Sequence, residues 1–258
     1  MTVGASQFSR VLDGEGGCAR GLPVLLTMCA THVVASMTGR CSRWRYHTRQ
    51  SSMPTMIPDT HLDIGCGTRP RNPYQRAKLY GLDIRQLPST PTCEFRSANL
   101  VLEPIPFSDG TLGSVSAFDF IEHVPRVLPV RDGQGTRFPF VELMNEIWRV
   151  LAVGGRFYAL TPAFPSAAAF HDPTHVNLIG EETHEYFSEP RMEGRMYGFS
   201  GRFRAIRAEW VIFDHAVDAL HEMTPTQRFR RWRWRRAGRL SHFLWELEKL
   251  PRDTSVSP

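Results

Sequence analysis

Short apolar runs alternate with amphipathic stretches through the middle of the chain. Five of these runs have the length and composition of strands, at residues 61–65, 80–84, 94–100, 114–121 and 156–161. Strands that alternate with longer amphipathic segments are typical of an α/β protein with a mainly parallel sheet. The hydrophobic pattern therefore predicts the fold class before any motif is considered.

Helices are expected where apolar positions recur every three to four residues. This period is clear between residues 140 and 151, and Gly154 and Gly155 follow as a stop signal. Residues 71–78 allow a second, short helix. We therefore expect a well-formed helix directly before the fifth strand.

The C-terminal part is expected to hold one long strand and a helical segment. Residues 201–213 alternate like a strand that forms an edge hairpin with 215–222. Residues 227–240 interleave arginines with three aromatic residues, Phe229, Trp232 and Trp234. Apolar residues continue this segment at helical spacing: Leu240, Phe243, Leu244, Leu247 and Leu250. We predict a helix at 226–258 whose aromatic side chains pack on the domain while its arginines face water.

The most apolar stretch of the chain lies at residues 21–37, before the strand pattern begins. It is shorter than the roughly 18–20 apolar residues of a membrane-spanning helix, and Pro23 and His32 interrupt it. We expect residues 1–55 to be a poorly ordered extension and residues 56–225 to be the functional domain. A secretory signal is the less favoured alternative, and we expect no transmembrane segment.

Composition narrows the class of protein without identifying a function. The 258 residues are 41% hydrophobic, which suits one large domain or two small ones and excludes collagen, a disulfide-rich miniprotein and a disordered chain. Five cysteines without paired spacing favour a reducing, cytoplasmic location over a disulfide framework or a zinc ribbon.

The net charge of +5 is distributed unevenly along the chain. Residues 1–60 carry +3 and residues 223–258 carry +6, whereas residues 61–222 carry −4. The basic ends therefore hide an acidic centre, and the whole-chain charge says little about a site in the middle.

A glycine turn and an acidic residue mark the first two predicted strands. Gly65 and Gly67 follow the first strand, where absent side chains let a ligand approach the backbone. Asp83 ends the second strand, 20 residues after Asp63, and its carboxylate can accept hydrogen bonds from both hydroxyls of a ribose. Thr68, Arg69 and Pro70 follow Gly67, so the last glycine of a dinucleotide fingerprint is missing, and no P-loop occurs. These features predict a nucleoside site.

Five motifs in order carry a resemblance to a known family. They are Leu-Asp-Ile-Gly-Cys-Gly-Thr at 62–68, Gly-Leu-Asp at 81–83, Asn-Leu at 99–100 with the Pro-Ile-Pro-Phe-Ser-Asp-Gly run from 104, Phe-Asp-Phe-Ile-Glu-His at 118–123, and Asn-Glu-Ile-Trp-Arg at 145–149. The chain resembles the class I S-adenosylmethionine-dependent methyltransferases, especially the methyltransferase type 11 group. The resemblance implies a Rossmann-like, mostly parallel seven-stranded sheet flanked by helices, with an antiparallel edge strand near the C-terminus.

The resemblance also implies a set of residues that bind S-adenosylmethionine. They are Asp63, Gly65, Cys66, Gly67, Asp83, Ile84, Asn99, Leu100, Phe118, Asp119 and His123. By this resemblance Asp83 holds the ribose and Asn99 contacts the adenine, where the family usually has an aspartate. The asparagine carbonyl can still accept a hydrogen bond from the adenine amino group.

The segment after the fifth strand holds the candidate catalytic residues. Methyl transfer from a sulfonium is an in-line displacement that depends on positioning, and it needs a base only if the acceptor must lose a proton. His171, Asp172 and His175 lie on this strand-exit loop and could supply that base. Equally, His171 and Asp172 could form a turn that Pro173 stiffens. A metal site of His171, Asp172 and His175 is the least favoured reading, and we predict no metal.

The predicted function is transfer of a methyl group to an O or N atom of a small molecule, such as a sugar or a specialised metabolite. Residues 119–123 lack the motif of DNA amino-methyltransferases, and no Pro-Cys nucleophile occurs, so nucleic acid is a less favoured substrate. Two alternatives stay open. One is an RNA-directed enzyme that uses the basic segment to follow phosphates and stack bases, and the other is a non-catalytic S-adenosylmethionine-binding module. The sequence leaves the oligomeric state open.

Overall fold

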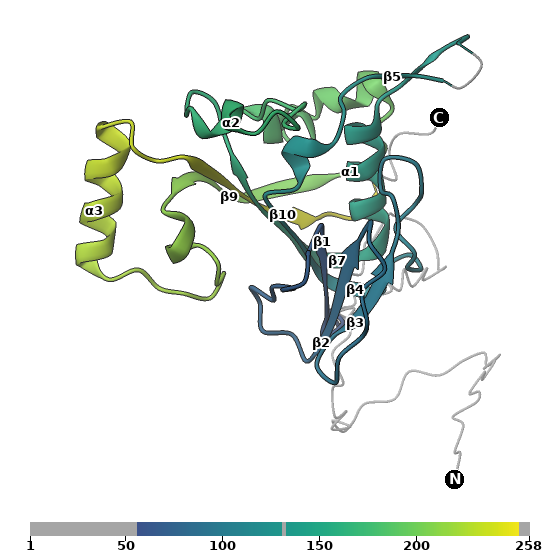
Figure 1. The fold of residues 1–258 in the computed structure, drawn as a ribbon, viewed down its shortest axis with the longest axis horizontal. Coiled ribbons are helices and arrows are strands. Elements are labelled where there is room, and N and C mark those ends of the chain that lie inside the picture. The colour runs from purple at the N-terminus through teal and green to yellow at the C-terminus, as the bar shows by residue number, and fades with distance from the viewer. Residues whose placement is uncertain (1–55, 131–132, 253–258) are drawn as a thin grey trace, which may run out of the picture. The chain divides into compact units, whose positions relative to one another are not determined.

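The computed structural model describes residues 56–130 and 133–252, which belong to one compact unit (Figure 1). The predicted extension at 1–55 lies outside the described residues. None of the helices in the described ranges combines the length and the apolar character that crossing a membrane requires.

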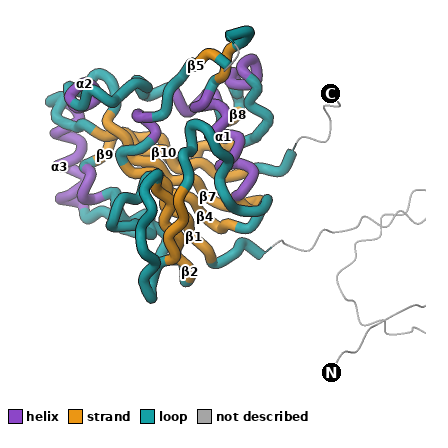
Figure 2. The backbone as a smooth tube through the Cα atoms, turned by 45° about the vertical axis from the view of Figure 1, so that its right-hand side comes forward, coloured by secondary structure: helices purple, strands orange, loops and turns teal. Residues whose placement is uncertain are grey.

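An eight-stranded sheet forms the centre of the unit, drawn in orange in Figure 2. Its strands are β1 (Thr60–Ile64), β2 (Lys78–Asp83), β3 (Glu94–Ser97), β4 (Leu112–Phe118), β7 (Leu151–Pro162), β8 (Ser188–Glu189), β9 (Phe203–Val211) and β10 (His242–Lys249). They lie in the order β3-β2-β1-β4-β7-β10-β9-β8. Two further short strands, β5 (Leu128–Pro129) and β6 (Thr136–Arg137), pair as a separate ribbon.

Most strand pairs are parallel, as the hydrophobic pattern predicts. All pairs from β3 to β7 are parallel, and β10 runs antiparallel to both β7 and β9. The mostly parallel sheet with an antiparallel strand near the C-terminus is confirmed, but the sheet has eight strands rather than seven. The eighth, β8, has two residues, too few to produce a periodic signal in the sequence.

The helix predicted around Leu240 to Leu250 is wrong, because these residues form β10. This strand lies between β7 and β9, and both of its faces are buried, with Leu244 and Trp245 at most 1% exposed. A strand covered on both faces shows no strict alternation, and periodicity alone cannot separate it from a buried helix. β10 also takes the place expected for residues 215–222 as the partner of β9.

Two of the helices among the described residues have 12 residues each. Helix α1 (Pro139–Val150) matches the predicted period and buries Phe140, Met144 and Ile147 in the core that it shares with the sheet. The other long helix is α3 (Pro225–Arg236). Shorter segments are α2 (Ala168–His171), η1 (Ile121–His123), η2 (Thr183–Tyr186), η3 (Glu193–Tyr197) and η4 (Phe213–His215).

The short helix expected at 71–78 does not form. Asn72 Oδ1 accepts a hydrogen bond from Arg76 N at 3.0 Å, and Asn72 Nδ2 donates to Arg76 O at 2.8 Å. Pro73 also disfavours helical backbone at Asn72. An asparagine that satisfies the backbone locally stabilises a loop in place of a helix.

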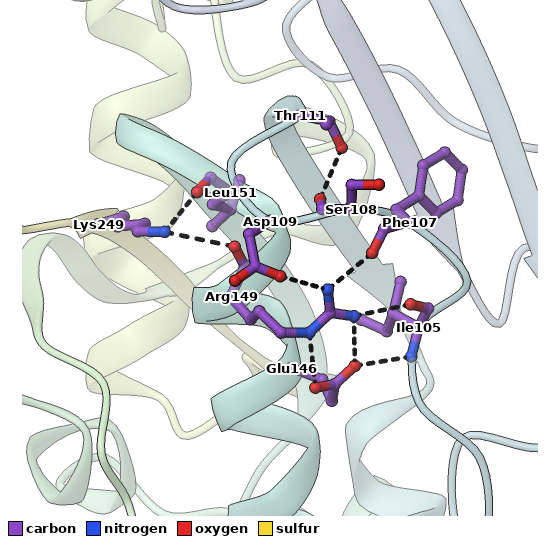
Figure 3. A network of polar contacts seen from close by, with 9 residues as sticks. All are labelled: Ile105, Phe107, Ser108, Asp109, Thr111, Glu146, Arg149, Leu151 and Lys249. Carbon is purple, nitrogen blue, oxygen red and sulfur yellow. Dashed lines mark hydrogen bonds and ion pairs between the residues drawn. The ribbon is translucent and has the colours of Figure 1, made fainter.

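The Asn-Glu-Ile-Trp-Arg motif of α1 has a structural role (Figure 3). The Arg149 guanidinium donates to both carboxylate oxygens of Glu146, to the carbonyls of Ile105 and Phe107, and to Asp109. Glu146 also accepts a hydrogen bond from Ile105 N at 2.9 Å. This network attaches the loop that leads into β4 to the C-terminal turn of α1.

Helix α3 begins with a capping box, in which Thr224 and Gln227 exchange hydrogen bonds between side chain and backbone. The expected docking of its aromatic side chains is realised only for Trp234, which packs against the core. Phe229 and Trp232 are 62% and 53% exposed and stack on each other. Helix α3 therefore presents arginines and two exposed aromatic rings to solvent.

Candidate functional site

The glycine turn after β1 has the backbone that its sequence predicts. Gly65 and Gly67 have φ angles of +66° and +57°, and Gly65 N and Cys66 N both donate to Leu82 O of β2. A Cβ atom on Gly65 would lie 2.2 Å from the Phe120 ring. Glycine is required here because any larger residue would clash with this ring and adopt an unfavourable φ.

The Asp83 carboxylate lies at the C-terminal end of β2, beside this turn. It accepts hydrogen bonds from Gly67 N at 2.9 Å, from Arg85 N at 3.0 Å and from Arg85 Nε at 2.8 Å. The Arg85 hydrogen bonds hold the pKa of Asp83 below its usual value. The carboxylate is therefore ionised, and Gly67 and Arg85 both donate hydrogen bonds to its oxygens.

A cavity of about 390 Å³ opens at the carboxyl ends of β1, β2 and β4. Seven predicted cofactor residues line it: Gly65, Asp83, Ile84, Asn99, Leu100, Asp119 and His123. The predicted set lacks its six other lining residues: Leu82, Arg85, Ala98, Val101, Phe120 and Val124. We call this space the strand-end cavity, and it matches the place where open parallel sheets bind ligands.

Asn99 shapes the loop at the edge of the strand-end cavity. Its Oδ1 accepts a hydrogen bond from Val101 N at 3.1 Å, and its own N–H donates to Glu103 at 2.9 Å. Ile84 lies on the same cavity and is 65% exposed, which leaves an apolar surface for a flat ring. Asn99 and Ile84 therefore give the strand-end cavity a polar edge and an apolar face.

The remaining predicted cofactor residues, Asp63, Cys66, Gly67 and Phe118, do not line the strand-end cavity. Cys66 is buried with its sulfur toward Gly81, and burial raises the pKa of its thiol to about 12. Phe118 packs against Tyr158 and Phe213. These two side chains contribute to packing under the turn.

Asp63 belongs to a buried polar network that crosses from β1 to β4. Its carboxyl accepts hydrogen bonds from Ser116 Oγ at 2.6 Å and from Arg71 N at 2.7 Å. His61 lies between Ser114 and Ser116, with each hydroxyl 2.8 Å from one ring nitrogen. Burial raises the pKa of Asp63 to about 7 and lowers the pKa of His61 to about 3. Both groups are therefore stabilised in their neutral forms.

A second cavity, of about 440 Å³, lies beyond β4 and β7 and shares Asp119 with the first. It is lined by Asp119, Glu122, Pro162, Ala167, Ala168, His171, Asp172, His175 and His242. All three predicted catalytic residues thus face one space, which we call the histidine cavity. Asp172 also accepts hydrogen bonds from Thr174 N and Oγ1, so it forms the turn that the sequence offered as the alternative.

The junction of the two cavities holds a pair that the sequence analysis missed. His242 Nε2 lies 3.0 Å from Asp119 Oδ1, and its Nδ1 lies 2.8 Å from Ser241 Oγ. The two residues are 123 positions apart, and no sequence signal links them. The pairing arises because β10 inserts beside β7, which brings His242 opposite Pro162.

Three potential ligand or proton-transfer groups meet where the two cavities adjoin: Glu122 and His175 line the histidine cavity, and His123 lines the strand-end cavity. Glu122 is 1% exposed, and burial raises the pKa of its carboxyl to about 8. His123 and His175 pack edge to face, with ring centroids 4.8 Å apart. The sequence separates Glu122 and His123 from His175 by more than fifty residues, so only the fold unites them.

No family model and no curated protein matches the chain. Solved structures that it resembles include a chain of the Haloferax volcanii complex that contains the Trm112 methyltransferase activator (TM-score 0.46, 16% identity, 77% of this chain and 86% of that one). Others are an S-adenosylmethionine-dependent methyltransferase of Archaeoglobus fulgidus (0.44, 15%, 74% and 86%) and geranyl diphosphate C-methyltransferase of Streptomyces coelicolor (0.43, 14%, 75% and 72%). At these values the similarity carries no inference about substrate or reaction.

Proposed function

We propose that this protein is an S-adenosylmethionine-dependent methyltransferase that methylates an O or N atom of a small molecule. The observation that carries the proposal is the pair of adjoining cavities at the carboxyl ends of the parallel strands, with Asp119 common to both. One cavity has the features of a nucleoside site, and the other presents proton-accepting side chains. A methyl donor and its acceptor must meet in this way for an in-line displacement.

In this proposal the strand-end cavity holds the cofactor. Asp83 accepts hydrogen bonds from the ribose once the exposed Arg85 side chain swings away, and Ile84 and Leu100 contact the adenine. Asp119 lies on the path toward the sulfonium and adds negative charge near its cationic centre. The −4 charge of residues 61–222 has the sign that favours a cationic cofactor.

The acceptor then lies in the histidine cavity. As the acceptor atom attacks the methyl carbon, the carbon–sulfur bond breaks and S-adenosylhomocysteine leaves. The acceptor proton passes to the Asp119 carboxylate, which the Nε2–H of His242 holds in position. His171 and His175 line the same cavity and are the alternative proton acceptors.

Calorimetric titration with S-adenosylmethionine and S-adenosylhomocysteine tests the cofactor site. We expect wild type to bind both and Asp83→Ala to bind at least about tenfold more weakly, because each lost hydrogen bond to a charged group costs about 1.5–3 kcal/mol. Glu182→Ala removes an exposed carboxylate outside both cavities and should bind like wild type. Absence of binding by folded wild type would refute the proposal.

Transfer itself is tested with a radiolabelled methyl donor and a small-metabolite extract. Labelled product that disappears in Asp119→Asn, with cofactor binding retained, supports catalysis at the junction of the cavities. Cofactor binding by wild type without any labelled product would favour the non-catalytic binding module.

One observation favours RNA as a second candidate substrate, namely the exposed rings and arginines of α3. A chain that ends near residue 225 would lose β10 along with α3, so charge reversal is the better test. Arg233→Glu with Arg236→Glu should abolish salt-sensitive RNA retention if α3 binds phosphates, whereas Arg191→Glu with Arg195→Glu should not. Equal retention by both double variants would exclude α3 as an RNA-binding element.

A further inference from the structure

Glu122, His123 and His175 form a cluster that the proposed methyl transfer does not require, since Asp119 takes the acceptor proton there and His175 is only an alternative to it. Glu122 and His123 belong to η1, and His175 lies in the loop that follows β7. One potential ligand atom from each side chain lies within 4.8 Å of the others. A histidine pair with one carboxylate is a common ligand set for zinc and related divalent metals.

Hydrogen bonds set the tautomers of both imidazoles. His123 Nδ1 lies 3.3 Å from the Thr174 carbonyl oxygen, and His175 Nδ1 lies 3.2 Å from the Ala169 carbonyl oxygen. A carbonyl can only accept, and Thr174 Oγ1, which lies 3.0 Å from His123 Nδ1, donates its own proton to Asp172 Oδ1, so each Nδ1 carries the proton and donates it. Each Nε2 is then left with a free lone pair. Metal-binding histidines in proteins are oriented by this kind of second hydrogen bond.

Only one of the two Glu122 carboxylate oxygens accepts a hydrogen bond from the part of the chain that the structure describes. Its Oε2 accepts a hydrogen bond from Thr161 Oγ1 at 2.9 Å, but its buried Oε1 has no hydrogen-bond partner among the described residues. A buried polar atom without a partner costs about 1–3 kcal/mol, so the structure calls for an occupant at this position. A cation bound to Glu122 Oε1 would be such an occupant.

The backbone holds the two segments of the cluster together. Val176 N and Asn177 N both donate to the Glu122 carbonyl, at 3.0 and 2.9 Å, and the buried Asn177 side chain donates to Ile121 O. Arg126 Nε in turn donates to Asn177 Oδ1 at 2.6 Å. The three candidate ligands therefore stand on a rigid frame, which limits the reorganisation that metal binding would cost.

We propose that Glu122, His123 and His175 bind one divalent first-row transition metal ion, with zinc as the best match. Three protein ligands leave an open coordination position; His123 lines the strand-end cavity, and Glu122 and His175 line the histidine cavity, from which an acceptor can reach the ion. Asp119 and Asp172 line the same cavity and make it attractive to a cation. The proposal replaces the expectation of no metal, and it differs from the set His171, Asp172 and His175 that the sequence offered.

The role of the metal rests on the proposed function. An oxygen or nitrogen atom of the acceptor occupies the open position, which orients the acceptor toward the methyl group and lowers the pKa of an acceptor hydroxyl. The substrate class is therefore a small molecule with a metal-binding oxygen or nitrogen atom at the methylated position.

Cobalt titration of the purified, chelator-treated full chain tests the site without any cofactor. We expect one Co²⁺ per chain with the visible absorption of a four- or five-coordinate ion, and displacement of that signal by one equivalent of Zn²⁺. Because loss of outer-sphere partners alone weakens metal binding about 10–100-fold, His123→Gln and His175→Gln should each weaken it by more than about 100-fold.

His171→Gln is the matched control, since His171 lines the same cavity outside the proposed ligand set and should keep wild-type affinity. Glu122→Gln retains the shape of the side chain and the contact with Thr161, so it isolates the carboxylate charge if a histidine variant misfolds. Absence of Co²⁺ binding by folded wild type, or unchanged binding in both Glu122→Gln and His175→Gln, would overturn the proposal.

Parallel calorimetry with S-adenosylmethionine separates this inference from the proposed function. Metal binding without cofactor binding would refute the methyltransferase and leave the metal site in place. Cofactor binding without metal binding would refute the metal site and leave the methyltransferase proposal in place.

Discussion

The buried carboxyl of Asp63 and the buried imidazole of His61, both neutral in the folded protein, change its stability with pH in opposite directions. Folded Asp63 keeps a proton that the unfolded chain releases above about pH 4, so its contribution falls as the pH rises toward 7. Folded His61 excludes a proton that the unfolded chain takes up below about pH 6.5, so its contribution falls as the pH drops toward 3. In wild type these two contributions to the slope of the unfolding free energy against pH offset each other.

Single substitutions should expose these slopes. Between pH 4.5 and 6.5 the unfolding free energy of Asp63→Asn should rise with pH relative to wild type, by up to about 1 kcal/mol per pH unit. Over the same pH range, the unfolding free energy of His61→Gln should fall with rising pH relative to wild type, by a similar amount per pH unit. Urea denaturation at several pH values measures both, and parallel profiles for all three proteins would contradict the neutral assignment.

Arg85 competes with any diol for the Asp83 carboxylate. The ion pair is exposed on the arginine side, at 59%, and such pairs contribute about 0–1 kcal/mol. Arg85→Ala should therefore tighten S-adenosylmethionine binding by up to about fivefold in calorimetry. Arg96→Ala, which removes an exposed pair on β3 away from the cavity, serves as the control. Weaker binding by Arg85→Ala would mean that Arg85 contacts the ligand.

At the scale of elements, β10 decides the architecture of the C-terminal half. Trp245 is fully buried, although a helical stripe through Leu244 and Leu247 would have placed it on the polar side. Trp245→Ala should lower the unfolding free energy by about 3–5 kcal/mol, as for other buried aromatic truncations. Trp232→Ala on the exposed side of α3 should change it by less than about 0.5 kcal/mol. Small effects on the unfolding free energy in both variants would contradict the burial of Trp245 in strand β10.

The Arg149 network joins α1 to the loop before β4, and it depends on the planar guanidinium. Arg149→Lys keeps the charge but cannot serve Glu146, Asp109 and two carbonyls together. We expect a loss of roughly 2–3 kcal/mol in urea denaturation, discounted for partial exposure of the site. Arg195→Lys, at an exposed position on η3, should be neutral. Wild-type stability of Arg149→Lys would show that the network adds little.

At the scale of the whole molecule, the described residues bury their own core. Ile57 and Pro58 already contact Gly113, where a Cβ would lie 1.9 Å from the Pro58 carbonyl oxygen. We predict that a chain that begins at Met56 folds with wild-type stability and cofactor affinity, whereas one that begins at Thr60 is destabilised. Thermal denaturation of the two shortened chains checks this, and equal loss in both would place essential contacts before residue 56.

The sequence by itself determined the features that depend on neighbouring residues. The Gly65–Gly67 turn, the acid at the end of β2, the period of α1 and the mainly parallel sheet are all visible locally, because backbone preference and burial periodicity act over a few residues. The loop at 71–78 was mispredicted because Asn72 and Pro73 outweighed a weak helical pattern.

Only the tertiary structure decided which distant groups meet. The place of β10 between β7 and β9, the His242–Asp119 pair and the cluster of Glu122, His123 and His175 follow from strand order and loop packing. A doubly buried strand has no diagnostic period, and contacts across more than fifty residues leave no mark in a single sequence. Local chemistry therefore predicted seven of the residues that line the strand-end cavity, and the fold assembled the histidine cavity.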